Sequence, residues 1–169
     1  MKKLLLGVLS ICFLSGSVIA GPDDPSKFKD TPYDAQKSLY DFNFQNPEDG
    51  EGAFHYIHNQ LNALEKFGDG EKSHVVIVAH GNVLHAMARE NRGKFPDMYT
   101  KLKKLTDRGV SVYACRNSAR SRGYDTSDFY DLVTVVPAAV AEIAKWQNEG
   151  YSYMYAEWFP RLEKEEIFK

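Results

Sequence analysis

The feature that most constrains the fold is an unbroken apolar run at residues 75–79 (VVIVA), in which four of the residues are β-branched. A strand with one solvated face alternates polar and apolar residues, whereas a strand covered on both faces reads as a continuous apolar run. Such strands belong to parallel sheets, because crossover helices cover both faces of the sheet. The run therefore predicts a central strand of a parallel α/β sheet.

Strand and helix patterns alternate on both sides of this run. Before it, Leu39, Phe42 and Phe44 predict a strand, and Asn46 followed by Pro47 predicts a helix start. That helix carries one apolar stripe, formed by Phe54, Ile57, Leu61 and Leu64. The run at 75–79 is followed by a short helix at 83–89 and by a helix with Met98, Leu102 and Leu105 that Gly109 closes. Strands are then predicted at 110–115 and 133–136. A helix with Val140, Ile143 and Trp146 that ends at Gly150 and a strand at 151–155 complete the pattern.

About five alternations of this kind predict one α/β domain with about five mostly parallel strands and helices on both faces, a flavodoxin-like layering.

The N-terminus has the pattern of an export signal. Lys2 and Lys3 precede an apolar segment at 4–14, and small or branched residues lead to Ala20. The apolar segment is shorter than the roughly 20 residues that a membrane span needs. We therefore expect cleavage after Ala20, a periplasmic location and no membrane attachment of the mature chain. The predicted organisation is a signal peptide at 1–20, an extended linker at 21–35, the domain at 36–156 and an extension at 157–169, which could dock on the domain or on a neighbour.

Removal of the signal changes the charge and the cysteine content. The formal net charge of −2 becomes −4 when Lys2 and Lys3 are lost, and no basic block is present, which argues against nucleic acid as a partner. Of the two cysteines, Cys12 leaves with the signal and Cys115 stays. An exported domain with one cysteine has no internal disulfide. Because an unpaired thiol is a liability in an oxidising compartment, its presence favours a chemical use of Cys115.

The predicted site lies where strands end. Ligands of open parallel sheets bind beyond the carboxyl ends of the strands, and Cys115 ends one predicted strand. A helix N-terminus with Arg116, Arg120 and Arg122 nearby would favour its thiolate, which can hold sulfane sulfur as a persulfide. The alternative is a buried cysteine that only packs.

His80 ends the central strand and could supply a proton to a leaving thiol, although a capping role is an open alternative. His55 and His58 lie three residues apart, but no third ligand is nearby, so we predict no metal site and no cofactor. Asp41, Asp125 and Asp128 are interpreted as caps and turn formers rather than as acid–base groups.

Three segments resemble the DsrE-like sulfur-relay family, and most closely its exported members: residues 75–81 (VVIVAHG), 109–117 (GVSVYACRN) and 133–153 (VTVVPAAVAEIAKWQNEGYSY). The resemblance extends over roughly 38–155. It implies a five-stranded α/β domain, homo-oligomers such as trimers or hexamers, and a cysteine that carries persulfide sulfur between partner proteins or small sulfur compounds.

By position, the persulfide role falls on Cys115, with His80, Asn82, Arg116 and Asn117 shaping the site. The sequence departs from the cytoplasmic relay members, which carry their cysteine in the loop after the second strand. Here that loop, residues 80–85, reads HGNVLH.

The leading hypothesis is a periplasmic sulfur-handling protein, either a carrier or a sulfurtransferase component. A second hypothesis is a non-catalytic oligomeric scaffold of the cell envelope, with a structural Cys115 and a binding surface at 151–158. A third is a metal-binding envelope protein that uses His55, His58, His80 or His85.

Overall fold

The computed structural model describes residues 21–167. The predicted signal peptide lies outside these residues. Among these described residues, 21–30 and 31–167 belong to two separate units. In the first unit, the described residues 21–30 are exposed and contain a turn, in which the Asp24 N–H donates to the Gly21 carbonyl at 3.1 Å. The second unit begins within the predicted linker, and its Tyr33 pairs with Gly68 in a parallel bridge.

The second unit is built on one sheet of five parallel strands, as predicted. In spatial order the strands run β4-β3-β2-β1-β5, and every neighbouring pair is parallel. The strands are β1 (Lys37–Phe42), β2 (His74–Ala79), β3 (Ser111–Cys115), β4 (Thr134–Val136) and β5 (Ser152–Tyr155). The helices between them are α1 (Asp49–Phe67), α2 (Val83–Met87), α3 (Met98–Thr106), α4 (Arg116–Arg120) and α5 (Ala139–Asn148). The described residues also contain three 3-10 helices: η1 (Arg89–Asn91), η2 (Thr126–Asp128) and η3 (Lys164–Glu166).

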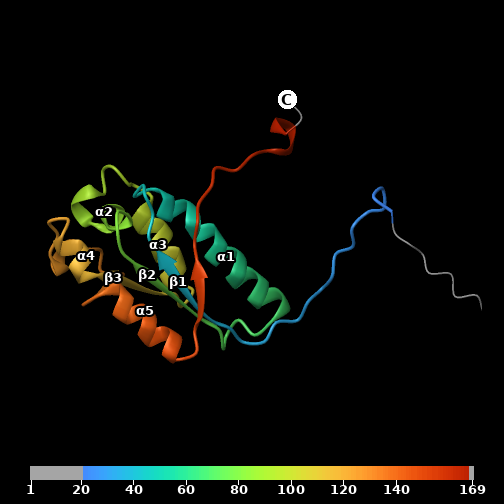
Figure 1. Ribbon diagram of the computed structural model, residues 1–169, viewed down its shortest axis with the longest axis horizontal. Helices are drawn as coiled ribbons and strands as arrows, with labels where there is room; N and C mark the ends of the chain where they lie inside the picture. The colour runs from blue at the N-terminus through green and yellow to red at the C-terminus, as the bar shows by residue number, and fades with distance from the viewer. Residues whose placement is uncertain (1–20, 168–169) are drawn as a thin grey trace, which may run out of the picture. The chain divides into compact units, whose positions relative to one another are not determined.

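Helices cover both faces of the sheet, and Figure 1 shows α1 and α5 on opposite sides of the strands. The predicted central strand β2 divides its side chains between two apolar clusters. Val75, Ile77 and Ala79 pack toward α1 and α3, whereas Val76 and Val78 pack toward α5. All five are at most 2 % exposed, which confirms that the apolar run marks a strand covered on both sides.

The predicted start of the first helix is wrong. The helix begins at Asp49 rather than after Asn46, and its N-cap residue Glu48 already has helical dihedral angles. The Asn46 side-chain amide donates to the Asp49 carboxylate at 3.1 Å and makes no cap to the backbone. The predicted apolar stripe of this helix is confirmed, because all four of its members are buried.

The chain reverses direction across the sheet after β4. Connections up to β4 move from β1 toward one edge, and α5 then carries the chain back to β5 at the other edge. Ala119 of α4 packs in the α1-side cluster, whereas Ala139 of α5 packs in the cluster on the opposite face. The connections that leave β3 and β4 therefore diverge, and such a switch point is where ligands of open parallel sheets bind. Cys115 stands at the carboxyl end of β3, paired with Val136 of β4.

The segment after β5 returns to α1. Trp158 packs against the α1-side cluster, and its ring lies 6.0 Å from that of His55. A docking position on the chain's own domain is thus observed for this part of the C-terminal extension. Within residues 21–167, no helix has the length and apolar content that crossing a membrane requires.

Candidate functional site

Cys115 is both the last residue of β3 and the N-cap of α4. Its Sγ accepts a hydrogen bond from the Ser118 backbone N–H at 3.4 Å, as a residue at a helix N-terminus can. The residue is 6 % exposed and packs in the α5-side cluster with Val76 and Val78. The position at a strand end and a helix start agrees with the sequence, and burial makes access to the thiol limited.

A hydrogen-bonded chain of polar side chains lies on the strands beside Cys115. The Asp41 Oδ1 bonds the His80 Nε2 at 2.9 Å, and the Tyr153 hydroxyl donates to the Asp41 Oδ2 at 2.6 Å. The side chains of His80 and Asp41 are only 24 % and 14 % exposed. A histidine at the end of β2, a carboxylate of β1 and a phenol of β5 are therefore joined by hydrogen bonds.

The sheet register places this chain next to the thiol. Ala79 of β2 pairs with Ala114 of β3, so His80 and Cys115 occupy the next level of the ladder. The His80 N–H still donates to the Phe42 carbonyl at 2.9 Å, which shows that the ladder continues beyond β2. Since Ala79 and Ala114 face the α1 side, His80 and Cys115 both face the α5 side. Asp41 pairs with Val78 rather than with His80, and Tyr153 pairs with Leu39 rather than with Asp41. Thiol, imidazole, carboxylate and phenol thus form a diagonal row across β3, β2, β1 and β5, whose adjacent strands lie about 4.8 Å apart.

The charges in this row are set by the hydrogen bonds. Burial alone raises the pKa of Asp41, but hydrogen bonds from His80 and Tyr153 and the charge of His80 outweigh burial and leave the pKa below its usual value. The bond to Asp41 is the largest cause that raises the pKa of Tyr153 to about 12, with burial second. Asp41 is therefore ionised and Tyr153 is neutral at physiological pH.

Asp41 determines which ring nitrogen of His80 carries a hydrogen. An ionised carboxylate accepts only, so the His80 Nε2 that faces it carries a hydrogen. In the neutral ring, Nδ1 then holds the lone pair and can accept a proton. The interpretation of Asp41 as a cap or turn former is wrong, because it lies within β1 and orients a histidine.

The loop after β2 is fixed by a second set of contacts. Gly81 has a positive φ of 73°, which favours glycine, and its N–H donates to the Ser118 Oγ at 2.9 Å. Asn82, predicted to bind substrate, donates to the Gln45 carbonyl at 2.8 Å and accepts from Arg122 at 3.2 Å. Both ends of its amide are used within the protein, which gives Asn82 a structural role in this arrangement.

The other two predicted substrate-binding residues lie on α4 and are exposed. Among the described residues, the side chains of Arg116 and Asn117 make no hydrogen bond or ion pair, while the Asn117 backbone N–H donates to the Pro137 carbonyl at 3.3 Å. Arg116 and Asn117 therefore remain available to a ligand, whereas Arg122 ties α4 to the loop after β2.

The histidines do not gather into a metal site. His55 contacts the Gly52 carbonyl, His58 contacts Arg108, and His85 contacts the Tyr124 hydroxyl. Nowhere in residues 21–167 do three histidine, cysteine or acidic side chains come together as a possible metal group.

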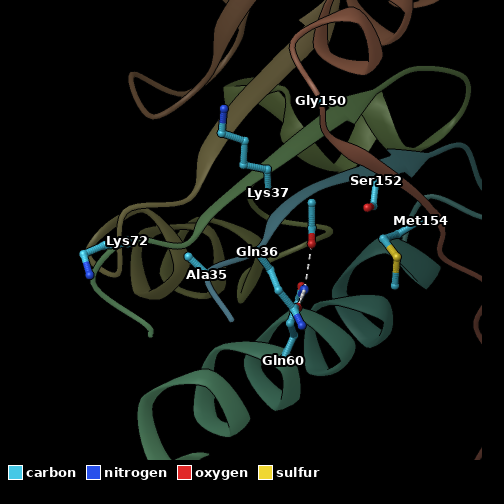
Figure 2. A pocket seen from close by; sticks show the side chains of 9 residues that line it. Ala35, Gln36, Lys37, Gln60, Lys72, Gly150, Ser152 and Met154 are labelled. Atoms are coloured by element: carbon cyan, nitrogen blue, oxygen red, sulfur yellow. Dashed lines mark hydrogen bonds between the residues drawn. The ribbon is translucent and has the colours of Figure 1, made fainter. Parts of the chain in front are cut away.

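A sizeable cavity lies away from this row. It measures about 620 Å³ and lies at the amino ends of β1 and β5. Figure 2 shows Gln60 reaching from α1 toward β1, and Lys37 and Lys72 also line the cavity. The Gln60 amide donates to Ser38 at 2.7 Å and to Gln36 at 2.8 Å. These amide and hydroxyl groups bond one another, and no cysteine is among the residues that line this cavity.

Two members of the row were not predicted as site residues. A signal existed for Asp41, because it is an acidic residue in a strand whose neighbours Tyr40 and Phe42 are buried. No comparable signal marks Tyr153, since only the register between β1 and β5 brings it near Asp41.

Together, these features define a parallel α/β domain with a thiol, an imidazole and a carboxylate at the carboxyl edge of its sheet. The DsrE/DsrF-like family model matches residues 29–156, and the chain belongs to this family. A solved structure with the same fold is the protein of unknown function MTH1491 from Methanobacterium thermoautotrophicum, with 23% identity and a TM-score of 0.57. The match covers 71% of this chain and 98% of that protein. No protein with a curated description matches the chain.

Proposed function

We propose that the protein handles sulfane sulfur in a sulfur relay, with Cys115 as the residue that holds the sulfur as a persulfide. Membership of the DsrE/DsrF-like family supports a role related to sulfur relay. The observation that carries the assignment to Cys115 is the hydrogen-bonded chain of His80, Asp41 and Tyr153 beside it. A carboxylate that orients an imidazole next to a thiol is an arrangement that activates nucleophiles.

In the proposed step, the Cys115 thiol passes its proton to the Nδ1 of His80. The thiolate then attacks a terminal sulfur of an inorganic polysulfide, and a new S–S bond forms at Sγ. The S–S bond of the donor breaks, and the shortened polysulfide leaves with the electron pair. No external oxidant is needed, because the donor sulfur already carries the oxidation level of the persulfide. Asp41 stabilises the imidazolium that the proton transfer creates.

Release follows the same chemistry. An acceptor thiolate attacks the outer sulfur of the persulfide, and the Cys115 thiolate leaves and regains a proton from His80. The exposed side chains of Arg116 and Asn117 would contact the anionic donor or acceptor. We further propose export with cleavage after Ala20, action in the periplasm, and assembly into trimers or hexamers that present Cys115 to partner proteins.

The proposal requires that a sulfur donor reach the buried thiol of Cys115. At 6 % exposure, Cys115 admits a small polysulfide more readily than a bulky reagent. We expect native Cys115 to react slowly with bulky maleimides.

Intact mass measurement tests the proposal. After treatment of the native protein with polysulfide and removal of excess reagent, we expect an added mass of about 32 Da, one sulfur atom, on the wild type. The Cys115→Ser variant should gain nothing, and a reductant should reverse the gain. If native protein stays unmodified while unfolded protein gains the sulfur, Cys115 is a packing residue and the proposal fails.

A further inference from the structure

A second polar cavity lies on the opposite face of the sheet from the row. It has a volume of about 390 Å³, and its lining is made of Arg89, Arg92, Tyr99, Tyr130 and Asp131. Tyr130 belongs to the α1-side cluster, and Tyr99 packs against that cluster. The cavity therefore shares no residue with the sulfur site and is independent of the proposed function.

Two loops that are distant in sequence build this cavity. Ala88 and Phe129 pair in an antiparallel bridge, and the Tyr130 N–H donates to the Met87 carbonyl at 3.4 Å. The Arg89 guanidinium donates to the Ser127 carbonyl, which adds a third tie between the same segments. The segment around η1 is thus held against the segment that leads to β4, so the cavity walls are preformed.

The two arginines of the cavity, Arg89 and Arg92, lie on the same side of their segment. Arg89 begins η1 and Arg92 follows it three residues later, and residues i and i+3 of a 3-10 helix lie on the same side. The Arg92 guanidinium lies 5.6 Å from the centre of the Tyr99 ring. A planar guanidinium that rests on an aromatic ring keeps its N–H groups free to bind an oxyanion from the side.

The aromatic wall contains an unsatisfied polar group. The rings of Tyr99 and Tyr130 meet edge to face at 5.1 Å, and Tyr130 is only 5 % exposed. The Tyr130 hydroxyl is buried and has no hydrogen-bond partner among the described residues. Such groups are uncommon in folded proteins, and an absent water or ligand is one physical explanation. Burial raises the pKa of Tyr130 and the charge of Arg92 opposes that rise, so the field of Arg92 reaches the phenol.

We infer that this cavity binds a small organic monoanion, a carboxylate or sulfonate with a planar apolar body. Arg89 and Arg92 would bind the acid group, and the rings of Tyr99 and Tyr130 would pack on the body. Asp131 offsets one of the two positive charges in the lining, which favours a single negative charge over a dianion. The volume fits an aromatic acid, since pockets for small ligands begin at about 300 Å³.

Titration with benzenesulfonate, followed by ¹H–¹⁵N NMR at constant ionic strength, tests this inference. We expect saturable shifts at the amides of residues 89–92, 99 and 130, and none with benzyl alcohol, which has the ring without the charge. Arg92→Gln should weaken binding about tenfold or more, because one charge-assisted pair is lost. Arg161→Gln, at an exposed arginine of the C-terminal segment that pairs with Glu163, serves as the matched control and should leave the affinity unchanged.

Tyr130→Phe separates binding from folding. The variant loses only an unpaired hydroxyl and keeps the ring that packs on the ligand, so its thermal stability should equal or exceed that of the wild type while its affinity for benzenesulfonate stays unchanged. Unsaturable shifts, equal affinities of the Arg92→Gln and Arg161→Gln variants, or sulfate binding as tightly as benzenesulfonate would each overturn the inference.

Discussion

Asp41 is the residue on which the proposed chemistry depends most. It sits in a strand between buried aromatic residues, where a charge is costly unless it is paired and hydrogen-bonded. Two donors satisfy it, His80 on one oxygen and Tyr153 on the other. Hydrogen bonds to a charged acceptor are stronger than neutral ones, so the carboxylate fixes both partners. This accounts for the ordered position of His80 beside Cys115.

The link between Asp41 and Tyr153 predicts a titration result. With Asp41 ionised, the pKa of Tyr153 is about 12, and the Asp41→Asn variant should lower it toward the ordinary 10.0. The absorbance of tyrosinate, followed between pH 9 and 13, measures the pKa of Tyr153, because phenols titrate in this range. The Tyr153→Phe variant identifies which step belongs to Tyr153. An unchanged curve in Asp41→Asn would contradict the observed bond.

The pKa shifts of Tyr153 and Asp41 make the stability of the folded protein depend on pH. Because folding raises the pKa of Tyr153, its contribution to stability is complete below 10.0 and is lost as the pH rises through about 12. Folding lowers the pKa of Asp41, so that contribution is complete above 3.8 and is lost as the pH falls through the folded value. The row is therefore intact across the whole physiological range.

At the scale of elements, the contact between α1 and α2 positions the loop after β2. Gly50 in the first turn of α1 has no side chain, and a Cβ there would meet Val83 and Phe44. Val83 begins α2 and is fully buried, so it has no room to move aside. The close approach of Gly50 to Val83 thus fixes the start of α2, which directly follows His80, Gly81 and Asn82.

Gly50→Ala should therefore destabilise the protein by about 1–3 kcal/mol, although alanine favours helix more than glycine does. Urea unfolding monitored by circular dichroism gives the change in free energy. Gly93→Ala is the matched control, because open space surrounds Gly93, and it should change stability little. In a double-mutant cycle, Val83→Ala should relieve part of the cost, and strict additivity would argue against this packing.

Parts of the fold and site follow from local sequence pattern, and parts do not. The β2 run and the α1 stripe are periodic signals, and they report burial directly. The same signals predict where the strands end, and Cys115 and His80 follow from this as residues at the carboxyl edge of the sheet. The partnership of Asp41 and His80 joins residues 39 positions apart, and it depends on a register that no local pattern contains. The helix start at Asp49 likewise does not follow from the Asn46–Pro47 pattern, since the Asn46 side chain bonds the Asp49 carboxylate instead of capping the helix.

At the scale of the whole molecule, the two faces of the sheet are unequally covered. The helices α1, α2 and α3 pack on one face, while the α5 side carries the smaller apolar cluster. Exposed apolar side chains remain at its margin, where Tyr155 is 61 % and Val140 75 % exposed. An association surface between copies is a natural use of such residues.

We accordingly expect the protein to sediment as an oligomer. Tyr155→Glu and Val140→Glu introduce a charge at this margin and should shift the distribution toward monomer in sedimentation velocity experiments. Tyr33→Glu alters an exposed tyrosine elsewhere and should not. A wild type that is monomeric at all concentrations would contradict the proposed assembly.

The rate at which polysulfide loads Cys115 tests the central claim most directly. Measured by intact mass in a time course at neutral pH, loading of the wild type should exceed that of His80→Gln by about 10²-fold, since glutamine can still bond Asp41 but cannot accept a proton. His55→Gln, at an exposed histidine of α1, should load at the wild-type rate. Equal rates for the wild type and His80→Gln would show that the row takes no part in the chemistry of the thiol.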